Sequence, residues 1–527
     1  MNTQSGPEPR DEPHSRTGRE PGDAAAAAVA GDDARAPDGR GRRWAVVGVP
    51  ALVALLLGLW GTGRPSLWAD ELATVDVARR SVPQILHLLR HVDAVHGAYY
   101  LLMHWFVDVA GFSSTAVRLP SVAATVVAAG VLAALGRSLA GPPAGLLAGL
   151  VFACTPVVSQ YALEARSYAL VTCAAVLATY AFVRALRSGG IVWFAVYGVL
   201  LVAVGALQIF GFLLVAAHLL TVVAVRRTWR VRLAWLVSVV VAGLLLVPLA
   251  WVASGQRSAV EWIPDPDVAH LWASVWGVTG SVAAVVLMGA LCAVALVRAR
   301  AGELVRVTVP WAVVPPAALL AASLAEPVFV ARYLLFCVPA VALLVGAGLT
   351  VRPRLVMVPV GLALLVVTAV VQPTLRRPDS KWHDVTPIVR VLKDEARPGD
   401  AFLVAPSGMR SLSSAYPQVF AGLSDIAQRS TGAHDGTLHG REVGGKELAR
   451  RLRNADRVWV VRRINGNRRV VALMRKRVAM VRKAGLRHRV GRWTAKRMRL
   501  TLYVRPDSTD TSGDTSADFS KPHGIGK

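Results

Sequence analysis

The sequence predicts an all-α polytopic membrane protein that is followed by a small α/β domain, and three observations lead to this prediction. Hydrophobic residues make up 54% of the 527 residues, and only 17% are charged. Soluble domains are about 45–50% apolar, whereas this chain has a mean hydropathy of +0.46. Apolar runs near the length of a membrane span recur between residues 44 and 372. After residue 372, shorter strand and helix patterns replace them.

The N-terminal segment, residues 1–43, is rich in Pro, Gly, Ala, Asp and Arg. Because it has few large apolar side chains to bury, we expect it to be disordered. Three arginines precede the apolar run from Trp44 to Trp60, as in a signal peptide. The run is longer than a typical signal-peptide core, and no small-residue cleavage site follows it. We therefore interpret it as a retained anchor with a cytoplasmic N-terminus.

Eleven apolar runs approach the length of a membrane-spanning helix. They cover residues 44–62, 119–136, 143–160, 168–187, 191–206, 209–225, 233–252, 279–297, 308–323, 333–351 and 355–372. A further run, residues 98–111, is too short to cross and carries His104 and Asp108. We therefore expect it to lie along the membrane interface.

The arginines indicate the orientation of these spans. If residues 98–111 do not cross, most loop arginines fall on one side of the bundle, as is typical of cytoplasmic loops. If they did cross, this rule would fail at almost every later loop. The first outer loop, residues 63–118, is an exception because it also holds arginines. Within it, apolar residues recur at helical spacing from Val82 to Val92, which predicts an amphipathic helix on the membrane surface.

With this topology, several polar groups lie on the outer face, outside the cytoplasm. They are Asp70, Glu71, His96, Tyr99, Glu164, Arg166, Tyr168, Glu261, Asp265, Asp267, Glu326, Arg332 and Tyr333. An ionised group near hydrocarbon costs a few kcal/mol, so it usually has a partner or a function. Glu164 and Arg166 could form a local ion pair. The number of separate clusters on one face nevertheless favours a functional site.

The chemistry of these groups suits group transfer at a membrane surface. A carboxylate can act as the general base for a hydroxyl nucleophile, and the planar guanidinium of arginine suits a phosphate leaving group. The same groups would suit a transporter or flippase of a lipid-linked or anionic substrate, although no repeated half of the kind found in many transporters is visible. A non-catalytic scaffold with a basic tail is a third alternative. All four cysteines lie inside apolar runs, without disulfide or zinc spacing.

Four segments together resemble the GT-C membrane glycosyltransferases. They are LWADE, HGAYYLLMHWFVDVAGFSSTAVRLPS, PVVSQYALEARSYAL and VFVARYLLFCVP. The resemblance covers about residues 44–372. It is to bacterial relatives of the protein O-mannosyltransferases and the lipid A aminoarabinose transferases, a group like glycosyltransferase family 39. Where that family has His-Pro-Pro-Leu-Tyr-Tyr, this chain has HGAYYLL, with Gly97 and Ala98 in place of both prolines.

This resemblance implies transfer of a sugar from a polyprenyl-phosphate donor to an acceptor hydroxyl on the outer face, with inversion. Mannose is the expected sugar and a pentose such as arabinose the alternative, while the acceptor could be a glycolipid, a polysaccharide or a protein. Asp70 would be the general base. The resemblance and the sequence pattern assign supporting roles to Glu71 and His96 in shaping the site, Glu164 in holding acceptor or sugar, Arg166 and Arg332 in binding the phosphate, and Tyr99, Tyr168 and Tyr333 in binding substrate.

No metal or other cofactor is expected with certainty, and a divalent metal is an alternative. Some relatives use one, and Asp70, Glu71, His96 and Glu164 could supply oxygen and nitrogen ligands. No motif in the sequence requires a metal.

Residues 373–506 predict a basic α/β domain outside the membrane. SKWHDVTPIVRVLKDEARPGDAFLVAP fits a helix, a turn and a buried strand, DRVWVVRR and RLTLYVRP fit strands, and residues 468–484 fit a helix. After residue 372 the chain holds 32 Lys and Arg against 14 Asp and Glu, which accounts for most of its net charge of +26. Such a domain attracts anionic headgroups or polymers, and we do not expect nucleic acid there. We expect residues 507–527 to be disordered.

Overall fold

The computed structural model describes residues 39–225, 227–256, 263–299, 302–464, 468–506 and 515–519. Residues 1–38 and most of 507–527 lie outside these ranges, so the disorder predicted there concerns segments that the structure does not describe. The chain from Val46 onward forms one compact unit. Two corrections follow at the ends. The first helix already begins at Gly39, and a short strand occupies Thr515–Asp518.

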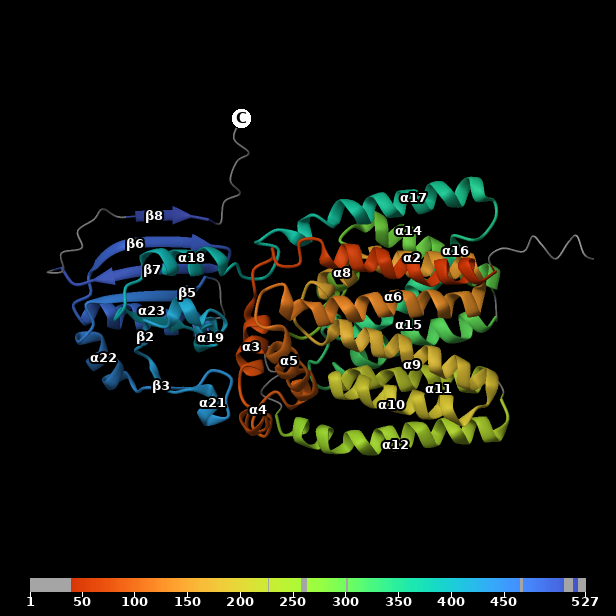
Figure 1. The fold of residues 1–527 in the computed structure, drawn as a ribbon, viewed down its shortest axis with the longest axis horizontal. Helices are drawn as coiled ribbons and strands as arrows, with labels where there is room; N and C mark the ends of the chain where they lie inside the picture. Colours follow the sequence, from red (N-terminus) through yellow and green to blue (C-terminus); the bar gives the residue numbers. More distant parts are fainter. Residues whose placement is uncertain are drawn as a thin grey trace, which may run out of the picture. The chain divides into compact units, whose positions relative to one another are not determined.

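A bundle of apolar helices forms the larger part of this unit (Figure 1). These helices are α2 (Gly39–Leu59), α6 (Leu119–Ala140), α7 (Pro142–Cys154), α8 (Pro156–Ala162), α9 (Tyr168–Ser188), α10 (Ile191–Leu207), α11 (Leu214–Val225), α12 (Trp229–Ser254), α14 (Val282–Ala299), α15 (Glu303–Ala322), α16 (Val338–Gly348) and α17 (Arg354–Val371). Each predicted span coincides with one of these helices, except that the predicted span 143–160 corresponds to both α7 and α8.

The length of each helix indicates how many could cross a membrane. Among the described residues, seven helices are long and apolar enough. An eighth is counted if α7 and α8, which are bent by 61° at Thr155, act as one span. The other three predicted spans coincide with shorter apolar helices. The total of eleven therefore stays a prediction.

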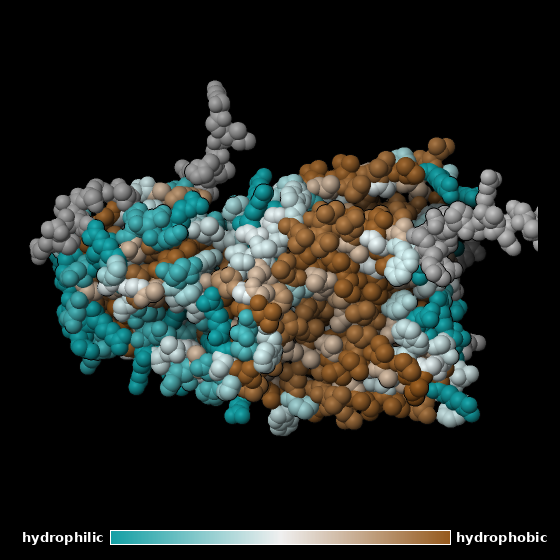
Figure 2. Space-filling model, in the orientation of Figure 1, coloured by the Kyte–Doolittle hydropathy of each residue, from teal (hydrophilic) through white to brown (hydrophobic). Residues whose placement is uncertain are grey.

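The outer surface of the bundle is apolar, whereas its interior is built on small residues. Figure 2 shows a broad hydrophobic band over the helices and hydrophilic residues over the α/β domain. Inside, Gly145 packs against the backbone of Ala133, and Gly346 against that of Ala148. A Cβ at Gly346 would lie 2.5 Å from the Ala148 nitrogen. Such close approach of two backbones is typical of helix packing in membranes. There the hydrophobic effect does not drive helices together, and small residues allow close van der Waals contact instead.

Three short helices cover one end of the bundle. They are α3 (Ala69–Ala78), α4 (Val82–Leu89) and α5 (Gly97–Ala110) (Figure 1). The amphipathic helix predicted after Val82 is confirmed as α4, whose Ile85 and Leu88 are fully buried. Outside the C-terminal domain, the helices α3 and α13 (Val268–Thr279) were not predicted. Both are short, and neither has an apolar run long enough to indicate a span.

The C-terminal domain is a six-stranded sheet with helices against it. The strand order is β2 (Ser424–Asp425), β1 (Ala401–Ala405), β5 (Arg457–Arg463), β7 (Met498–Val504), β6 (His488–Ala495) and β8 (Thr515–Asp518). Parallel pairing joins β2, β1 and β5, and also β6 and β8, whereas β5, β7 and β6 pair antiparallel. A separate two-stranded sheet pairs β3 (Gln428–Ser430) with β4 (Arg441–Glu442).

The helices of this domain are α18 (Thr386–Glu395), α19 (Ser411–Ala415), α20 (Pro417–Phe420), α21 (Gly432–Asp435), α22 (Gly445–Arg453) and α23 (Arg468–Lys483). The predicted helix, turn and buried strand at the start of the domain are confirmed as α18 and β1. The strands β5 and β7 and the helix α23 are confirmed as well. β6 was missed because polar residues interrupt its apolar pattern. β8 forms where a disordered tail was expected, because the edge of β6 offers unpaired backbone groups.

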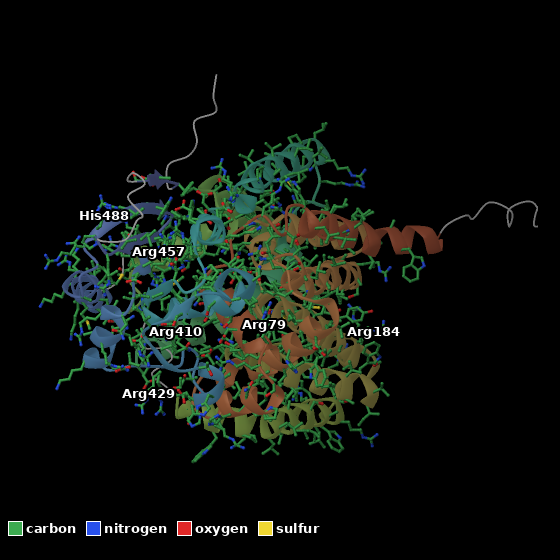
Figure 3. The ribbon with its side chains drawn as sticks, turned by 60° about the vertical axis from the view of Figure 1, so that its left-hand side comes forward. Arg79, Arg184, Arg410, Arg429, Arg457 and His488 are labelled. Carbon is green, nitrogen blue, oxygen red and sulfur yellow. The ribbon has the colours of Figure 1, made fainter. Side chains whose placement is uncertain are left out.

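Basic residues are spread over this domain, as its composition predicts. Figure 3 shows Arg410, Arg429, Arg457 and His488 on different elements of it. The domain also contacts the short helices at the end of the bundle. Arg80, which follows α3, donates hydrogen bonds of 2.9 and 3.1 Å to the carbonyl oxygens of Thr437 and Leu438.

Candidate active site

Glu71 and Arg118 form a buried ion pair beneath the start of α3. Arg118 Nε lies 2.8 Å from Glu71 Oε1, and Arg118 Nη2 lies 2.9 Å from Oε2. Both side chains are fully buried. The Ala165 amide also donates to Oε1 at 2.9 Å, and the Trp68 amide to Oε2 at 3.4 Å. We call this pair with its hydrogen-bond partners the Arg118 floor.

Arg118 is satisfied on its other side by backbone carbonyl groups. Its Nη1 donates to the carbonyl oxygens of Thr62 and Pro65 at 2.7 and 2.9 Å, and its Nη2 reaches that of Ser66 at 3.4 Å. These contacts tie the chain between α2 and α3 to the start of α6. Burial alone would raise the pKa of Glu71, but the charges of Arg118 and Lys381 and the hydrogen bonds outweigh this effect and lower it. The carboxylate is therefore held ionised.

Asp70 has a different environment from its neighbour. It lies in the first turn of α3, where the helix dipole favours a negative charge. Its side chain is half-buried, and within the described residues its carboxylate accepts no hydrogen bond. Asp70 nevertheless interacts electrostatically with Arg166 and Arg332. Its two oxygens are thus available to a ligand while cations lie nearby.

His96 and Arg166 come together on the other side of α3. Arg166 Nη2 lies 2.8 Å from His96 Nε2. Because a guanidinium only donates hydrogen bonds, Nε2 is the acceptor and the ring proton is on Nδ1. Burial lowers the pKa of His96 well below its ordinary value, and the charges of Arg166 and Arg332 add to this effect. Tyr99 and Tyr100 of α5 pack beside them, both fully buried.

Glu164 pairs with a residue from the C-terminal segment. Its Oε2 lies 3.2 Å from Lys381 Nζ, and both side chains are buried. Its other oxygen, Oε1, is buried with no hydrogen-bond partner among the described residues. Burial raises the pKa of Glu164, and the charges of Glu71 and Asp70 raise it further, although Lys381 opposes them.

A polar cavity of about 130 Å³ opens beside this pair. Its lining consists of Trp68, Gln160, Tyr161, Glu164, Arg332, Leu375, Ser380, Lys381 and Trp382. Arg332 lies 5.9 Å from the ring centres of Trp68, Tyr168 and Tyr333. We call this space the Lys381 cavity. Cations together with aromatic rings suit a ligand that carries both a phosphate and a sugar.

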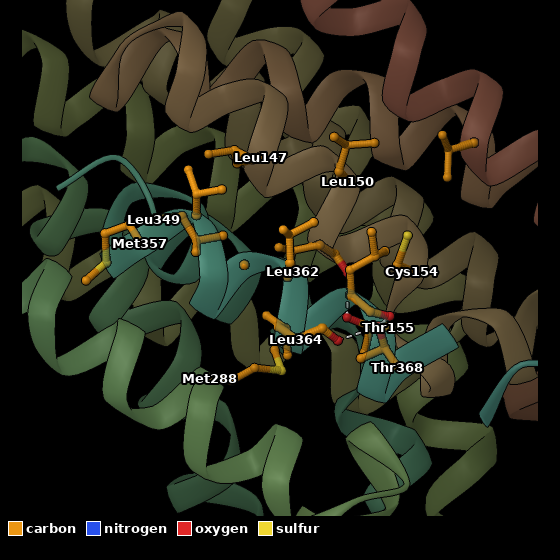
Figure 4. A pocket seen from close by; sticks show the side chains of 15 residues that line it. Leu147, Leu150, Cys154, Thr155, Met288, Leu349, Met357, Leu362, Leu364 and Thr368 are labelled. Carbon is orange, nitrogen blue, oxygen red and sulfur yellow. Dashed lines mark hydrogen bonds between the residues drawn. The ribbon is translucent and has the colours of Figure 1, made fainter. Parts of the chain in front are cut away.

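An apolar groove is lined by stretches of chain that continue toward the cavity, from Thr155 to Gln160 and from Thr368 to Leu375. It is open on one side and has a volume of about 460 Å³ (Figure 4). Its lining comes mainly from α7, between Leu147 and Cys154, and from α17, between Met357 and Thr368. The Gln372 side chain donates to the Cys154 carbonyl oxygen at 2.9 Å, which joins the two helices at the end of the groove.

The structure brings most of the residues predicted from the sequence together. Asp70, Glu71, His96, Tyr99, Glu164, Arg166, Tyr168, Arg332 and Tyr333 all lie at the end of the bundle covered by α3 and α5. The alternative of a local Glu164–Arg166 ion pair is wrong, because Glu164 pairs with Lys381 and Arg166 with His96. Asp267 instead caps α13, accepting from the His270 amide at 2.6 Å. Glu261 lies outside the described residues.

Sequence reasoning missed two residues of the site, Arg118 and Lys381. Arg118 stands in the stretch SSTAVRLPS that carries the resemblance, but nothing in its spacing indicates a partner 47 residues away. Lys381 stands at the start of the segment that was predicted to open the α/β domain, so no role in the membrane site was expected for it.

A metal site does not form from the predicted ligands. Within the described ranges, no three His, Cys, Asp or Glu side chains gather closely enough to hold a metal ion. Glu71 is already bound by Arg118 and Glu164 by Lys381. These residues therefore do not fit a metal in this arrangement.

Comparisons with known proteins concern a part of the sequence and the fold. Residues 98–251 match the family described as dolichyl-phosphate-mannose-protein mannosyltransferase. No curated protein sequence matches the chain. Two crystal structures of ArnT from Cupriavidus metallidurans, one in the apo state and one bound to undecaprenyl phosphate, match with a TM-score of 0.59 at 12% identity. The alignment with the apo form covers 87% of this chain and 97% of the ArnT chain. The alignment with the bound form covers 89% of this chain and 99% of the ArnT chain.

A weaker likeness is to the archaeal oligosaccharyltransferase AglB from Archaeoglobus fulgidus, in complex with an inhibitory peptide and a dolichol-phosphate. The alignment with AglB has a TM-score of 0.49 at 10% identity and covers 89% of this chain and 75% of the AglB chain.

The fold defines the class. The chain is a multi-pass membrane protein with the GT-C fold and a small C-terminal α/β domain. The match over residues 98–251 and the shared fold confirm the resemblance drawn from the sequence. Both findings agree with the similarity of this chain to the GT-C membrane glycosyltransferases related to the protein O-mannosyltransferases and aminoarabinose transferases.

Proposed function

We propose that the protein transfers a sugar from a polyprenyl-phosphate donor to an acceptor hydroxyl at the outer face of the membrane. One observation carries the proposal. The Asp70 carboxylate, which accepts no hydrogen bond from the described residues, is close enough to Arg166 and Arg332 to interact with both. The cavity lined by Arg332 and an apolar groove suited to a lipid chain are lined by successive residues of the same two stretches of chain, Thr155 and Gln160 on one and Thr368 and Leu375 on the other. ArnT, which has a similar fold, binds undecaprenyl phosphate in one structure.

The reaction needs one base and one stabilised leaving group. The acceptor oxygen attacks the anomeric carbon, and Asp70 accepts the hydroxyl proton as the new carbon–oxygen bond forms. The bond from the anomeric carbon to the phosphate oxygen breaks, and its electron pair stays with the polyprenyl phosphate. Attack opposite the leaving group inverts the anomeric centre. Arg332, and Arg166 behind it, stabilise the phosphate charge.

The other residues position these groups. The Arg118 floor holds Glu71 and, through it, the first turn of α3 on which Asp70 stands. Neutral His96, held by Arg166, borders the sugar together with Tyr99, and Glu164 binds the acceptor or the sugar. The rings of Tyr168 and Tyr333, with centres 6.4 Å apart, form an aromatic wall beside Arg332.

Mannose is the proposed sugar, and arabinose or another pentose is the alternative. The acceptor is a glycolipid, a polysaccharide or a protein in the cell envelope. The proposed site of action is the cell membrane, with the N-terminus in the cytoplasm and the C-terminal domain outside. In that position, the basic domain faces anionic headgroups or polymers.

A transfer assay tests this function. Membranes that contain the protein are supplied with polyprenyl-phosphate sugars carrying a radiolabel, mannose first and pentoses next, and NMR of the product gives its anomeric configuration. We expect a labelled product of inverted configuration. The flippase alternative predicts a different result. Vesicles that contain the protein would move a labelled lipid-linked sugar from one leaflet of their membrane to the other and would show no transfer from any donor, and this result would overturn the proposal.

A further inference from the structure

One segment of the C-terminal domain that reaches the site is residues 378–385. Two hydrogen bonds hold the segment to Ser66, four residues before Asp70. The Ser66 amide donates to the Pro378 carbonyl oxygen at 3.0 Å, and the Val385 amide donates to Ser66 Oγ at 2.9 Å. The segment is therefore anchored at both of its ends to the chain that leads into α3.

The turn between β6 and β7 holds the same segment from the other side. Lys496 Nζ donates to the Asp379 carbonyl oxygen at 2.6 Å, and the Asp384 amide donates to the Lys496 carbonyl oxygen at 3.2 Å. The Arg497 guanidinium lies 4.3 Å from the ring centre of Trp382. Because the sheet sets the position of this turn, the C-terminal domain sets the position of the segment.

Lys381, in the middle of the segment, points into the Lys381 cavity. Its side chain is only 7% exposed, which is unusual for a lysine. Its ammonium lies 3.2 Å from Glu164 Oε2 and 3.5 Å from the Gln160 carbonyl oxygen. These long contacts leave hydrogen-bonding capacity in the group, since an ammonium has three donors. Ser380 Oγ is also buried without a partner among the described residues.

The cavity and the apolar groove lie on the same two stretches of chain. Along the first stretch, Thr155 lines the groove and Gln160 lines the cavity. Along the second, Thr368 lines the groove and Leu375 lines the cavity. An amphipathic molecule could therefore lay its apolar chain along α7 and α17 and present its polar end to Lys381 and Arg332. Two cations against the single carboxylate of Glu164 favour an anionic end.

We propose that Lys381 binds the phosphate group of the lipid-linked donor, whose polyprenyl chain occupies the groove between α7 and α17. This rests on the proposed function and names a donor contact that comes from outside the membrane bundle. When phosphate enters, the Lys381 ammonium shifts from Glu164 toward it and, with Arg332, balances its charge. The C-terminal domain thereby completes the donor site.

Binding of undecaprenyl phosphate to purified full-length protein in nanodiscs tests this directly. A charge-assisted hydrogen bond contributes about 1.5–3 kcal/mol, so Lys381→Met is expected to raise the Kd by about 10-fold to 100-fold. Lys381→Arg keeps the charge and should keep most of the affinity. Lys393→Met is the matched control, because Lys393 is an exposed lysine on α18, and its Kd should equal that of the wild type. Melting temperatures show that each variant is folded.

Two further ligands separate the possible sources of affinity. Undecaprenol, which lacks the phosphate, should bind equally to the wild type and Lys381→Met. Inorganic phosphate should compete weakly, because it lacks the chain that fills the groove. If it competes as strongly as undecaprenyl phosphate, the assignment of the groove is overturned.

A double variant excludes a purely structural role. If Lys381 serves only to neutralise Glu164, then Lys381→Met combined with Glu164→Gln should restore wild-type binding. If Lys381 binds the phosphate, the double variant should still bind more weakly than the wild type, although loss of the Glu164 carboxylate removes its repulsion of the phosphate. Restored binding would overturn the proposal.

The outcome is distinguishable from failure of the transferase proposal. Sugar transfer by the wild type, together with equal binding by Lys381→Met and Lys393→Met, overturns the role of Lys381 alone. Lysine-dependent binding without transfer from any donor overturns the transferase and keeps the phosphate site. A wild-type protein that does not bind undecaprenyl phosphate overturns the assignment made here.

Discussion

The Arg118 floor and the Lys381 cavity are two buried ion pairs at the same end of the bundle, and they differ in how completely they are satisfied. The Glu71 carboxylate accepts four hydrogen bonds, and three carbonyl groups occupy the remaining donors of Arg118. Glu164 has one cation at 3.2 Å and one oxygen without a partner among the described residues. The fully hydrogen-bonded pair of Glu71 and Arg118 therefore holds the structure around α3 in place, whereas the incompletely satisfied pair of Glu164 and Lys381 borders a space for a ligand.

The largest expected effect comes from Asp70, which stands between the two regions. Asp70→Asn keeps the size of the side chain and removes the base, so transfer should fall about 10²-fold to 10⁴-fold. The melting temperature should stay close to that of the wild type, because this half-buried carboxylate accepts no hydrogen bond within the described part of the chain. Transfer assays and thermal unfolding of the same preparation check both expectations.

The next effect breaks the Arg118 floor. Arg118→Met leaves Glu71 as a buried charge without its partner and should lower the free energy of unfolding by about 3–5 kcal/mol. Arg184→Met is the matched control, because Arg184 is exposed at the far end of α9 (Figure 3). Denaturant unfolding in detergent measures the difference. Equal stability of the two variants would contradict the structural role assigned to the floor.

The two carboxylates should respond to pH in opposite directions. The pKa of Glu71 is lowered below its ordinary value of 4.5, so its contribution to stability is present above that value and is lost as pH falls through the folded-state pKa. The pKa of Glu164 is raised, so its burial destabilises the fold as pH rises from 4.5 through the folded-state pKa.

Substitution by glutamine separates these contributions. Glu164→Gln should not show the loss of stability that the wild-type carboxylate causes as pH rises above 4.5, although its overall stability should be lower because buried Lys381 loses its partner. Glu71→Gln should lose less stability than the wild type on acidification. Melting temperatures recorded from pH 3 to pH 8 check both signs. If the melting temperatures of Glu164→Gln and Glu71→Gln depended on pH in the same way, the two carboxylates would not differ as proposed.

The smallest effect concerns the support of the Lys381 segment. Arg497→Ala removes the cation–π contact with Trp382, which at an exposed position contributes about 0.5–1 kcal/mol. The KM for donor should therefore rise about twofold to fivefold with kcat nearly unchanged. Arg487→Ala, at another exposed arginine of the domain, should leave KM unaltered. A change in kcat alone would argue against support of donor binding.

Local patterns explain what could be predicted from the sequence. Long apolar runs identified the bundle because each span must bury its own backbone polar groups. The gathering of Asp70, Glu164 and Arg332 followed from topology. The partner of Glu71 could not be predicted, because Arg118 is 47 residues away and the pairing depends on how α3 packs against the turn that precedes α6. Lys381 was missed because its role depends on the fold of a separate domain.

The most direct test compares Asp70→Asn and Glu71→Gln side by side for transfer of a radiolabelled polyprenyl-phosphate sugar and for melting temperature. The account predicts that Asp70→Asn is as stable as the wild type but has almost no transfer. It predicts that Glu71→Gln melts at a lower temperature and keeps measurable transfer while it is folded. Wild-type transfer by Asp70→Asn would contradict the account, because the half-buried carboxylate that interacts with Arg166 and Arg332 would then not be the base.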